Sequence, residues 1–466
     1  MNKRINTTNP RDFYSVNTMA ILVCLIICLL ITAVWYLAPL PYTGIILSIA
    51  PLAILFVINQ TFWPVILFVM FSFFRIHEVI PVLYPLKIPL LLSAGALAAL
   101  LWHGLISRQL KPYWHPSLTW LALFWIMVMA GVIFASNRPI AIEQFKGIYW
   151  KIIVMTLAII WIANRESHLA HISRLMTLAG LLVGATAIYN SINGIGLVEG
   201  SRVTIGRNLG SMLGDPNDLA LVLMFPLAFS LSIMLTKGHH TLFRFTAALT
   251  SLVLLFAVIA TQSRGGLLGA LSVCGIFTFR HIRSKTLILS IGLIAVIVLY
   301  TVAGISDRAS GGAAEAGVDA SAMGRIYAWE AAFKMALDNP LTGVGLNNFY
   351  FNYYYYSSHW DGLNHAVHST WFGVLAETGF LGLLIFIGFI ASLIRTARKT
   401  VRLTQNPSRP HSYHVITIAY AVYAGLIGTV VSGTFLTQGF NWPIYILAAL
   451  TICVAQIANQ NENSHR

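Results

Sequence analysis

The sequence predicts an all-α polytopic membrane protein, and its composition and hydropathy lead to that prediction. Of the 466 residues, 57% are hydrophobic and only 9% are charged, so a soluble domain of this length would lack the charged side chains that solvate its surface. The mean hydropathy is +0.76. The apolar residues gather in runs of roughly 17–25, the length that lets one helix cross a bilayer.

These runs predict about 12–14 transmembrane helices. The first run, Met19 to Pro39, is too long for the apolar core of a cleavable signal peptide and has no clear cleavage site, so we expect it to be the first span. The third run is short, as a partly inserted segment would be. The full set lies near residues 19–38, 43–59, 61–74, 86–104, 117–135, 149–164, 172–192, 217–236, 245–261, 265–279, 286–303, 369–394, 415–434 and 442–459.

The chain is expected to divide into four parts. Residues 1–192 form N-terminal transmembrane helices, and residues 193–303 form further spans joined by arginine-bearing segments. Residues 304–368 form one long loop, and residues 369–466 form the C-terminal helices and tail. All of the cysteines lie inside apolar runs, which favours packing over a disulfide framework or a zinc site; they are Cys24, Cys28, Cys274 and Cys453.

Charge predicts the orientation. If the N-terminus is cytoplasmic, the inside segments carry 18 of the 29 Lys and Arg residues but only 3 of the 15 Asp and Glu residues, as the positive-inside tendency requires. The net charge of +14 therefore reflects topology and contact with anionic lipid, and it does not indicate nucleic-acid binding. The same orientation places the long loop outside the cytoplasm, in the periplasm of a cell with two membranes.

The long loop is predicted to contain a short amphipathic helix from Ser321 to Leu337, ended by Asn339-Pro340. We expect this helix to lie on the membrane surface or to pack across the bundle. The tyrosine-rich run at 347–356 suits either the headgroup zone or the stacking of sugars. Five apolar residues recur at helical spacing along the helix: Ala328, Trp329, Ala332, Phe333 and Ala336.

Arg264 is the most informative single residue. It stands between two apolar runs, directly before Gly265-Gly266, on the side where the charge bias disfavours arginine. An arginine at a membrane boundary is costly unless it has a partner, which favours a functional role over simple snorkelling to headgroups.

Arg207 lies in a glycine-rich segment that leads into Asp215-Pro216. Asp215 as N-cap and Pro216 at the first helical position predict a helix start, and such N-termini attract phosphate oxygens. Asp215 and Asp218 as a metal pair is an alternative, although capping explains both carboxylates more simply.

His368 opens the helix that follows the long loop, and histidine is the side chain that accepts a proton near neutral pH. His365 is its nearest competitor. The plain alternative for either residue is an interfacial histidine bonded to the backbone. Glu377 is an acid inside a predicted span, and we expect it to partner an arginine on the outside.

These residue types fit one chemistry. Two arginines can clamp a diphosphate through bidentate contacts, and a nearby histidine can deprotonate a hydroxyl. The arginines would then stabilise the charge that grows on the leaving diphosphate, so that no metal is needed. The sequence therefore predicts glycosyl transfer from a lipid diphosphate at the outer face of the membrane.

Five short motifs between Gly206 and Leu383 resemble, in their order and their common side of the membrane, the O-antigen ligase and polymerase superfamily of bacterial membrane proteins. The segment Phe74 to Pro81 and Asp215-Pro-Asn-Asp218 also resemble the branch of putative O-glycosylation ligases associated with exosortase systems. The five motifs are Arg207-x-x-Gly210 running into Asp215-Pro-Asn-Asp-Leu-Ala220, Thr261-x-Ser-Arg-Gly265, Gly324-Arg325-x-x-x-Trp329, Asn339-Pro-Leu-x-Gly-Val-Gly345, and His368-x-x-Trp-Phe with Glu377-x-Gly379-x-x-Gly382.

The resemblance implies a glycan transferase of the bacterial inner membrane, independent of metal and cofactor, with its active site facing the periplasm. It implies an undecaprenyl-diphosphate-linked glycan as donor and a glycan, lipid A core or protein as acceptor. Catalysis is expected from Arg207, Arg264 and His368, although the family's usual His-Asn pair is His368-Ser369 here. Substrate binding is expected from Arg202, Arg325, His365, Trp329 and Glu377.

Two other classes remain as alternatives. A polymerase of the same fold would use a second lipid-linked glycan as acceptor, and the sequence does not separate it from a ligase. A transporter of lipid-linked glycans is less favoured, because it predicts a midplane site and internal repeats, whereas the polar residues here cluster at the outer face.

Overall fold

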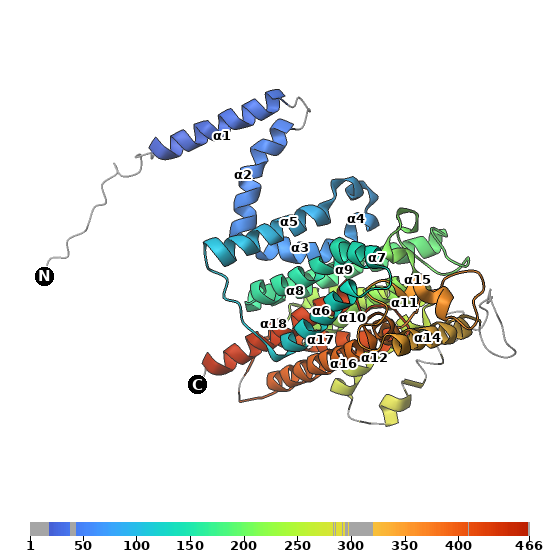
Figure 1. Ribbon diagram of the computed structural model, residues 1–466. Helices are drawn as coiled ribbons and strands as arrows, with labels where there is room; N and C mark the ends of the chain where they lie inside the picture. The colour runs from blue at the N-terminus through green and yellow to red at the C-terminus, as the bar shows by residue number, and fades with distance from the viewer. Residues whose placement is uncertain are drawn as a thin grey trace. The chain divides into compact units, whose positions relative to one another are not determined.

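The computed structural model describes residues 18–37, 43–282, 320–408 and 410–464, together with a few positions between 284 and 297. Within these residues the regular structure is helical, apart from one isolated bridge between Val198 and Arg202. The chain forms two compact units, residues 1–61 and residues 62–466 (Figure 1). The predicted all-α class is confirmed.

The first unit contains α1 (Thr18–Leu37) and α2 (Thr43–Asn59). Their described leucines are exposed, as Leu29 and Leu52 show with 68% of each residue accessible. Exposed apolar side chains on uncharged helices are suited to contact with lipid.

The second unit contains the remaining helices. The π-helical turns Trp102–Ile106 and Phe145–Tyr149 extend α5 and join α7 to α8. The helices are α3 (Phe62–Phe73), α4 (Ile76–Val79), α5 (Ile88–Leu101), α6 (Pro116–Ile133), α7 (Arg138–Gln144), α8 (Trp150–Ile162), α9 (Glu166–Asn193), α10 (Pro216–Leu235), α11 (Thr241–Ala260), α12 (Arg264–His281), α14 (Ala320–Asp338), α15 (Phe349–Tyr356), α16 (Thr370–Thr404), α17 (Tyr413–Gly433) and α18 (Trp442–Ser464).

Nine helices of the described chain are long and apolar enough to cross a membrane. They include the continuous helix Arg138–Ile162, which begins 11 residues before the predicted span at 149–164. The predicted span at 61–74 is α3, whose 12 residues are too few to cross alone. Most of the predicted span at 286–303, and residues 304–319 of the long loop, lie outside the described residues.

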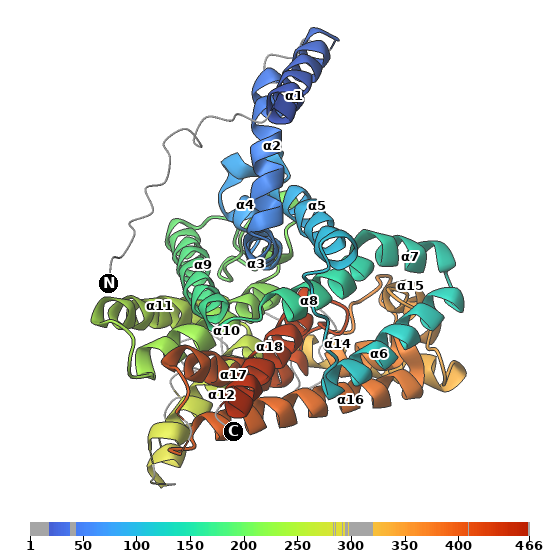
Figure 2. The same cartoon turned by 90° about the vertical axis from the view of Figure 1, so that its left-hand side faces the viewer.

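Helix α10 is the centre of the bundle. It packs against α9, α11, α12 and α17, and Figure 2 shows it among these neighbours. All its residues from Leu219 to Ser230 are buried. Close approach depends partly on small residues, since a Cβ at Gly180 of α9 would lie 2.1 Å from Cβ of Pro226. The central position of α10 places its N-terminus in the middle of one end of the bundle.

Helix α16 is broken near its start. Gly379 has φ +71°, a left-handed conformation that favours glycine, and a Cβ there would meet the Pro340 carbonyl oxygen at 2.5 Å. The loop before α15 satisfies the backbone groups that the break frees. Val344 N–H donates to the Ala376 oxygen, and Phe380 N–H donates to the Pro340 oxygen, both at 2.8 Å.

The predicted helix of the long loop is α14, and its bounds agree with the prediction to within a residue or so. It packs against α16, in agreement with the expectation that this helix packs across the bundle. Its buried stripe contains Ala328, Ala332 and Ala336, whereas Phe333 is 44% exposed. The tyrosine run forms a short helix, α15, which was not predicted.

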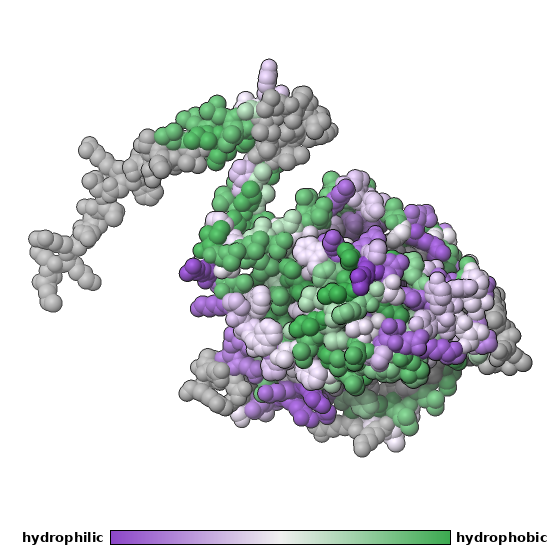
Figure 3. All heavy atoms as spheres, in the orientation of Figure 1, coloured by the Kyte–Doolittle hydropathy of each residue, from purple (hydrophilic) through white to green (hydrophobic). Residues whose placement is uncertain are grey.

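The segments predicted to share a side of the membrane gather at the same end of the bundle. At one end, Asn137 N–H donates to Asn348 Oδ1 at 2.9 Å. At the other end, Trp161 Nε1–H donates to the Tyr113 oxygen at 3.2 Å and His239 bonds Thr417 at 2.7 Å. On the face in Figure 3 the middle is mostly apolar and hydrophilic side chains lie toward both ends, as a bilayer-spanning bundle requires.

Candidate active site

The N-terminus of α10 is capped as predicted. Asp215 Oδ1 accepts the N–H groups of Asn217 at 2.7 Å and Asp218 at 3.2 Å, and Pro216 follows the cap. Asp215 is exposed, so the capped end of α10 is open at the surface. The exposed start of a buried helix attracts anions through its free N–H groups and its dipole.

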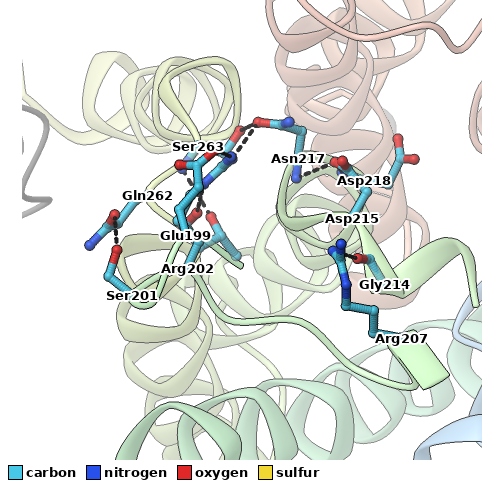
Figure 4. A network of polar contacts seen from close by, with 11 residues as sticks. Glu199, Ser201, Arg202, Arg207, Gly214, Asp215, Asn217, Asp218, Gln262 and Ser263 are labelled. Carbon is cyan, nitrogen blue, oxygen red and sulfur yellow. Dashed lines mark hydrogen bonds and ion pairs between the residues drawn. The ribbon is translucent and has the colours of Figure 1, made fainter. Parts of the chain in front are cut away.

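Arg202 is committed to protein partners, as Figure 4 shows. It is 5% exposed, and its Nε donates to the Thr261 carbonyl oxygen at 3.2 Å. Its Nη2 donates to Asn217 Oδ1 at 3.0 Å, and its Nη1 lies 3.7 Å from Glu199 Oε1. A guanidinium used in this way holds the 194–218 segment against α10 and the end of α11. The substrate-binding role expected for Arg202 stays a prediction.

Arg264 is the first residue of α12. Ser263 caps this helix by accepting Gly266 N–H at 3.2 Å, and its hydroxyl donates to Asn217 Oδ1 at 2.8 Å. The glycines after Arg264 permit close packing, since a Cβ at Gly266 would lie 2.4 Å from Ala220 Cβ. The Arg-Gly-Gly motif thus brings Arg264 to the start of α10.

Arg207 is exposed beside the same helix start. It begins a tight turn between Gly206 and Gly210, whose φ values are +64° and +65°. Its Nη1 donates to the Gly214 carbonyl oxygen at 3.2 Å (Figure 4). This bond uses one part of the guanidinium, and the exposed side chain is presented beside Asp215.

Asn217 links these arginine-bearing segments and was not predicted as a site residue. Its Oδ1 accepts from both Arg202 and Ser263. In the sequence, Asn217 is a single polar residue between Asp215 and Asp218. The contact depends on how α10, α11 and α12 pack, and no local pattern encodes that packing.

His368 lies within electrostatic reach of several of these groups. Burial lowers its pKa most, and the positive charge of Arg325 lowers it further. Asp215 acts in the opposite direction, and Arg202 and His365 add weaker lowering. The structure therefore brings the predicted histidine near Arg325 on α14 and near the capped end of α10. The result is an imidazole that is neutral, and able to accept a proton, at neutral pH.

The backbone around His368 is held on both sides. His368 has φ 44°, an uncommon conformation for a residue with a side chain. Trp329 Nε1–H donates to the Val367 oxygen at 3.1 Å, and its ring stacks on Phe372 with centroids 5.1 Å apart. Trp329 was expected to bind substrate, and these contacts show it supporting the turn that contains His368.

Gln438 connects the two halves of the site. It is 1% exposed, and its Nε2 donates to Asp218 Oδ1 at 2.9 Å. Its backbone N–H donates to Thr370 Oγ1 at 3.0 Å, and that hydroxyl donates to the Leu436 oxygen at 2.6 Å. The start of α16, with His368 just before it, is thereby joined to the start of α10.

Gln438 was not predicted as a site residue, because it lies in the short connection 435–441 between two predicted spans. One signal in the sequence could have indicated Gln438, namely the predicted topology. This connection belongs to the same side of the membrane as the arginines, and glutamine is a polar residue that pairs when buried.

His365 is paired with Asp361. The distance from His365 Nε2 to Asp361 Oδ2 is 2.9 Å, and this bond lowers the pKa of the Asp361 carboxyl. The ring of His365 also meets Tyr353 edge-on, with centroids 5.4 Å apart. The contacts with Asp361 and Tyr353 therefore hold His365 in place, three residues before His368.

Glu377 was expected to partner an arginine, and that expectation is wrong for the described chain. Its Oε2 accepts Asn347 N–H at 2.8 Å and its Oε1 accepts Phe349 N–H at 3.4 Å. The residue is 9% exposed. Glu377 thus fastens the loop before α15 to α16 and accepts N–H groups at the start of α15.

Among the described residues, no group of three or more His, Cys, Asp or Glu side chains could hold a metal ion. Asp215 and Asp218 are used for capping and for the bond to Gln438.

The fold and the site define a polytopic helical membrane protein with arginines and a histidine gathered at one end of its bundle. Residues 249–387 match the family described as O-antigen ligase. This match supports the O-antigen ligase superfamily and, in general terms, a glycosyltransferase of the ligase or polymerase type. The matched range contains Arg264, Arg325 and His368, and Arg207 precedes it. No curated protein matches the sequence.

Proposed function

We propose that the protein transfers a glycan from undecaprenyl diphosphate to an acceptor hydroxyl, on lipid A core or on a protein, at the periplasmic face of the inner membrane. The observation that supports this most is the meeting of His368 with Arg325 and with the anion-attracting start of α10. A base and a diphosphate site are what such a transfer needs on one side of the membrane.

In the proposed reaction, His368 accepts the proton of the acceptor hydroxyl. The acceptor oxygen forms a bond to the anomeric carbon of the donor sugar as the bond from that carbon to the diphosphate oxygen breaks. The electron pair leaves with undecaprenyl diphosphate. Arg207 and Arg264 hold the diphosphate and stabilise its added charge, and Arg325 contributes positive potential beside His368.

The remaining expected site residues have supporting roles in this proposal. Arg202 holds the arginine-bearing segments together, Trp329 and Glu377 fix the loops, and His365 stands next to the base. In this proposal the diphosphate of the donor contacts Arg207, which is exposed, and Arg264, which is half-buried.

A polymerase is the second candidate, since the family includes both reactions. The transferred bond is the same, and the acceptor is another lipid-linked glycan. Glycans of a deletion strain distinguish the two. Loss of long chains indicates a polymerase, and loss of attachment to the acceptor indicates a ligase.

The direct test incubates purified protein in nanodiscs with a lipid-diphosphate oligosaccharide and each candidate acceptor. We expect a glycosylated acceptor and free undecaprenyl diphosphate in equal amounts. Protein that consumes no donor with any lipid A, protein or glycan acceptor, while remaining folded, would contradict the proposal.

A further inference from the structure

The opposite end of the bundle contains a basic groove. It lies between α12, α16 and α17 and has a volume of about 350 Å³. Three arginines and no carboxylate line it, and no ion pair within the described chain involves any of the three. The lining residues are Arg280, Arg398, Arg402, Ile276, Phe279, Val401, Gln405, Tyr420 and Tyr423.

Arg280 is held at the wall of this groove. Its guanidinium carbon lies 3.7 Å from the ring centroid of Tyr420, and the Tyr420 hydroxyl is engaged by the side-chain amide of Gln405. Arg280 Nη1 is buried and has no hydrogen-bond partner among the described residues. A buried charged donor without an acceptor is destabilising, so an anionic acceptor in the groove would relieve that cost.

An apolar groove continues from the basic one. It has a volume of about 470 Å³ and shares Ile276 and Phe279 with the basic groove. Gly275 leaves open space there, because a Cβ at this position would meet nothing within 4 Å. Its lining is Leu268, Leu271, Ser272, Gly275, Ile276, Phe279, Gly292, Ile427 and Val431. The two grooves together therefore present a cationic end and an apolar length.

We propose that this combined groove binds one anionic diacyl phospholipid. Its phosphate lies among Arg280, Arg398 and Arg402, and an acyl chain lies along the apolar part. Arginine forms bidentate bonds to phosphate, and basic pockets between transmembrane helices on the cytoplasmic side are suited to anionic headgroups. The site is distinct from the donor site, because Arg264 and Arg280 are at opposite ends of α12, about 24 Å apart at 1.5 Å per residue.

Native mass spectrometry of the purified protein with added phosphatidylglycerol, phosphatidylcholine or a polyprenyl phosphate tests the headgroup. We expect preferential binding of phosphatidylglycerol. The variant R398Q/R402Q should lose about tenfold or more of that binding, because each lost charge-assisted bond to phosphate costs about a decade of affinity. The matched control is R395Q/K399Q, which removes the same charge from exposed positions of the same helix outside the groove.

Two results would overturn the headgroup assignment. Equal loss of phosphatidylglycerol in both double variants would show general surface attraction, and loss of polyprenyl phosphate alone would assign the groove to that lipid. The variant Gly275→Leu tests the apolar part, because a Cβ at this position would meet nothing within 4 Å and the rest of the leucine would enter the groove. It should weaken phosphatidylglycerol while leaving short-chain glycerophosphate unchanged, and undiminished long-chain binding would refute the acyl placement.

Discussion

At the residue scale, the backbone conformation of His368 bears most directly on its proposed role as a base. Its φ of 44° carries strain of about 1–3 kcal/mol, which persists only where surrounding contacts hold the backbone. Trp329 and the Thr370–Gln438 contacts supply that support. The strained turn leaves the imidazole half-buried beside Arg325, which keeps it neutral.

The pH dependence of transfer follows from that setting. Burial and Arg325 lower the pKa of His368 below the ordinary histidine value, so the acid limb of the rate should lie at lower pH than for an ordinary histidine. Replacing Arg325 by Gln removes a cation, so the pKa should rise and the acid limb of kcat should move to higher pH. Measuring kcat from pH 5 to 8 checks both statements, and an unmoved acid limb in R325Q would argue against His368 as the base.

Substitution of Arg202 should mainly affect stability, because this residue is buried and hydrogen-bonded, whereas substitution of Arg207 should mainly affect the rate of transfer, because this residue is exposed. Arg202→Gln leaves buried acceptors unpaired and should lower the free energy of unfolding by about 2–3 kcal/mol. Arg207→Gln should change stability by less than about 0.5 kcal/mol while slowing transfer about 10²–10³-fold. Thermal unfolding in detergent measures the effect on stability, and initial rates measure the effect on transfer. An R207Q variant that is destabilised but transfers at the normal rate would contradict the proposed role of Arg207.

At the scale of elements, the break in α16 fixes the position of the end of this helix that follows His368. The segment from Asn339 to Gly345 fits the break closely, since a Cβ at Gly343 would meet the Ala376 oxygen at 2.3 Å. Two sequence motifs that suggested function are thus explained by packing. Their contribution is to hold α14, α15 and the start of α16 as one support for His368.

Gly379→Ala tests that support. The left-handed φ costs a side chain about 1–2 kcal/mol, and the contact with the Pro340 oxygen at 2.5 Å adds to it. We expect a loss of at least about 2 kcal/mol in unfolding free energy. Gly275→Ala is the control, because open space surrounds that helical glycine and alanine should stabilise the helix by up to about 1 kcal/mol. Equal stability of the two variants would show that the break does not require glycine at position 379.

At the scale of the whole molecule, the bundle and its two ends were largely predictable. Long apolar runs fix which segments become helices, and the uneven distribution of charge fixes which connections lie together. Asn217, Gln438 and the partners of Glu377 were not predictable, because their contacts join segments far apart in the chain. The break at Gly379 lies in a continuous apolar run, and hydropathy gives no sign of it.

The orientation in the membrane is tested by labelling. Asn208→Cys and Gln109→Cys place thiols at exposed positions on the two predicted sides, and the native cysteines lie in helices. In cells with a permeabilised outer membrane, an impermeant maleimide should label N208C, and it should leave Q109C on the opposite side unlabelled until the cells are lysed. The reverse pattern would place the candidate site in the cytoplasm.

The central claim is that His368 is the base of a glycan transfer. The most direct measurement is the single-turnover rate of transfer from a lipid-diphosphate oligosaccharide by purified H368A. The matched control is H359A, which removes an exposed histidine of the same loop. We predict that H368A loses about 10²–10⁴-fold in rate while it binds donor and unfolds like the unaltered protein, and that H359A keeps its rate. Transfer by H368A at the unaltered rate would contradict the account.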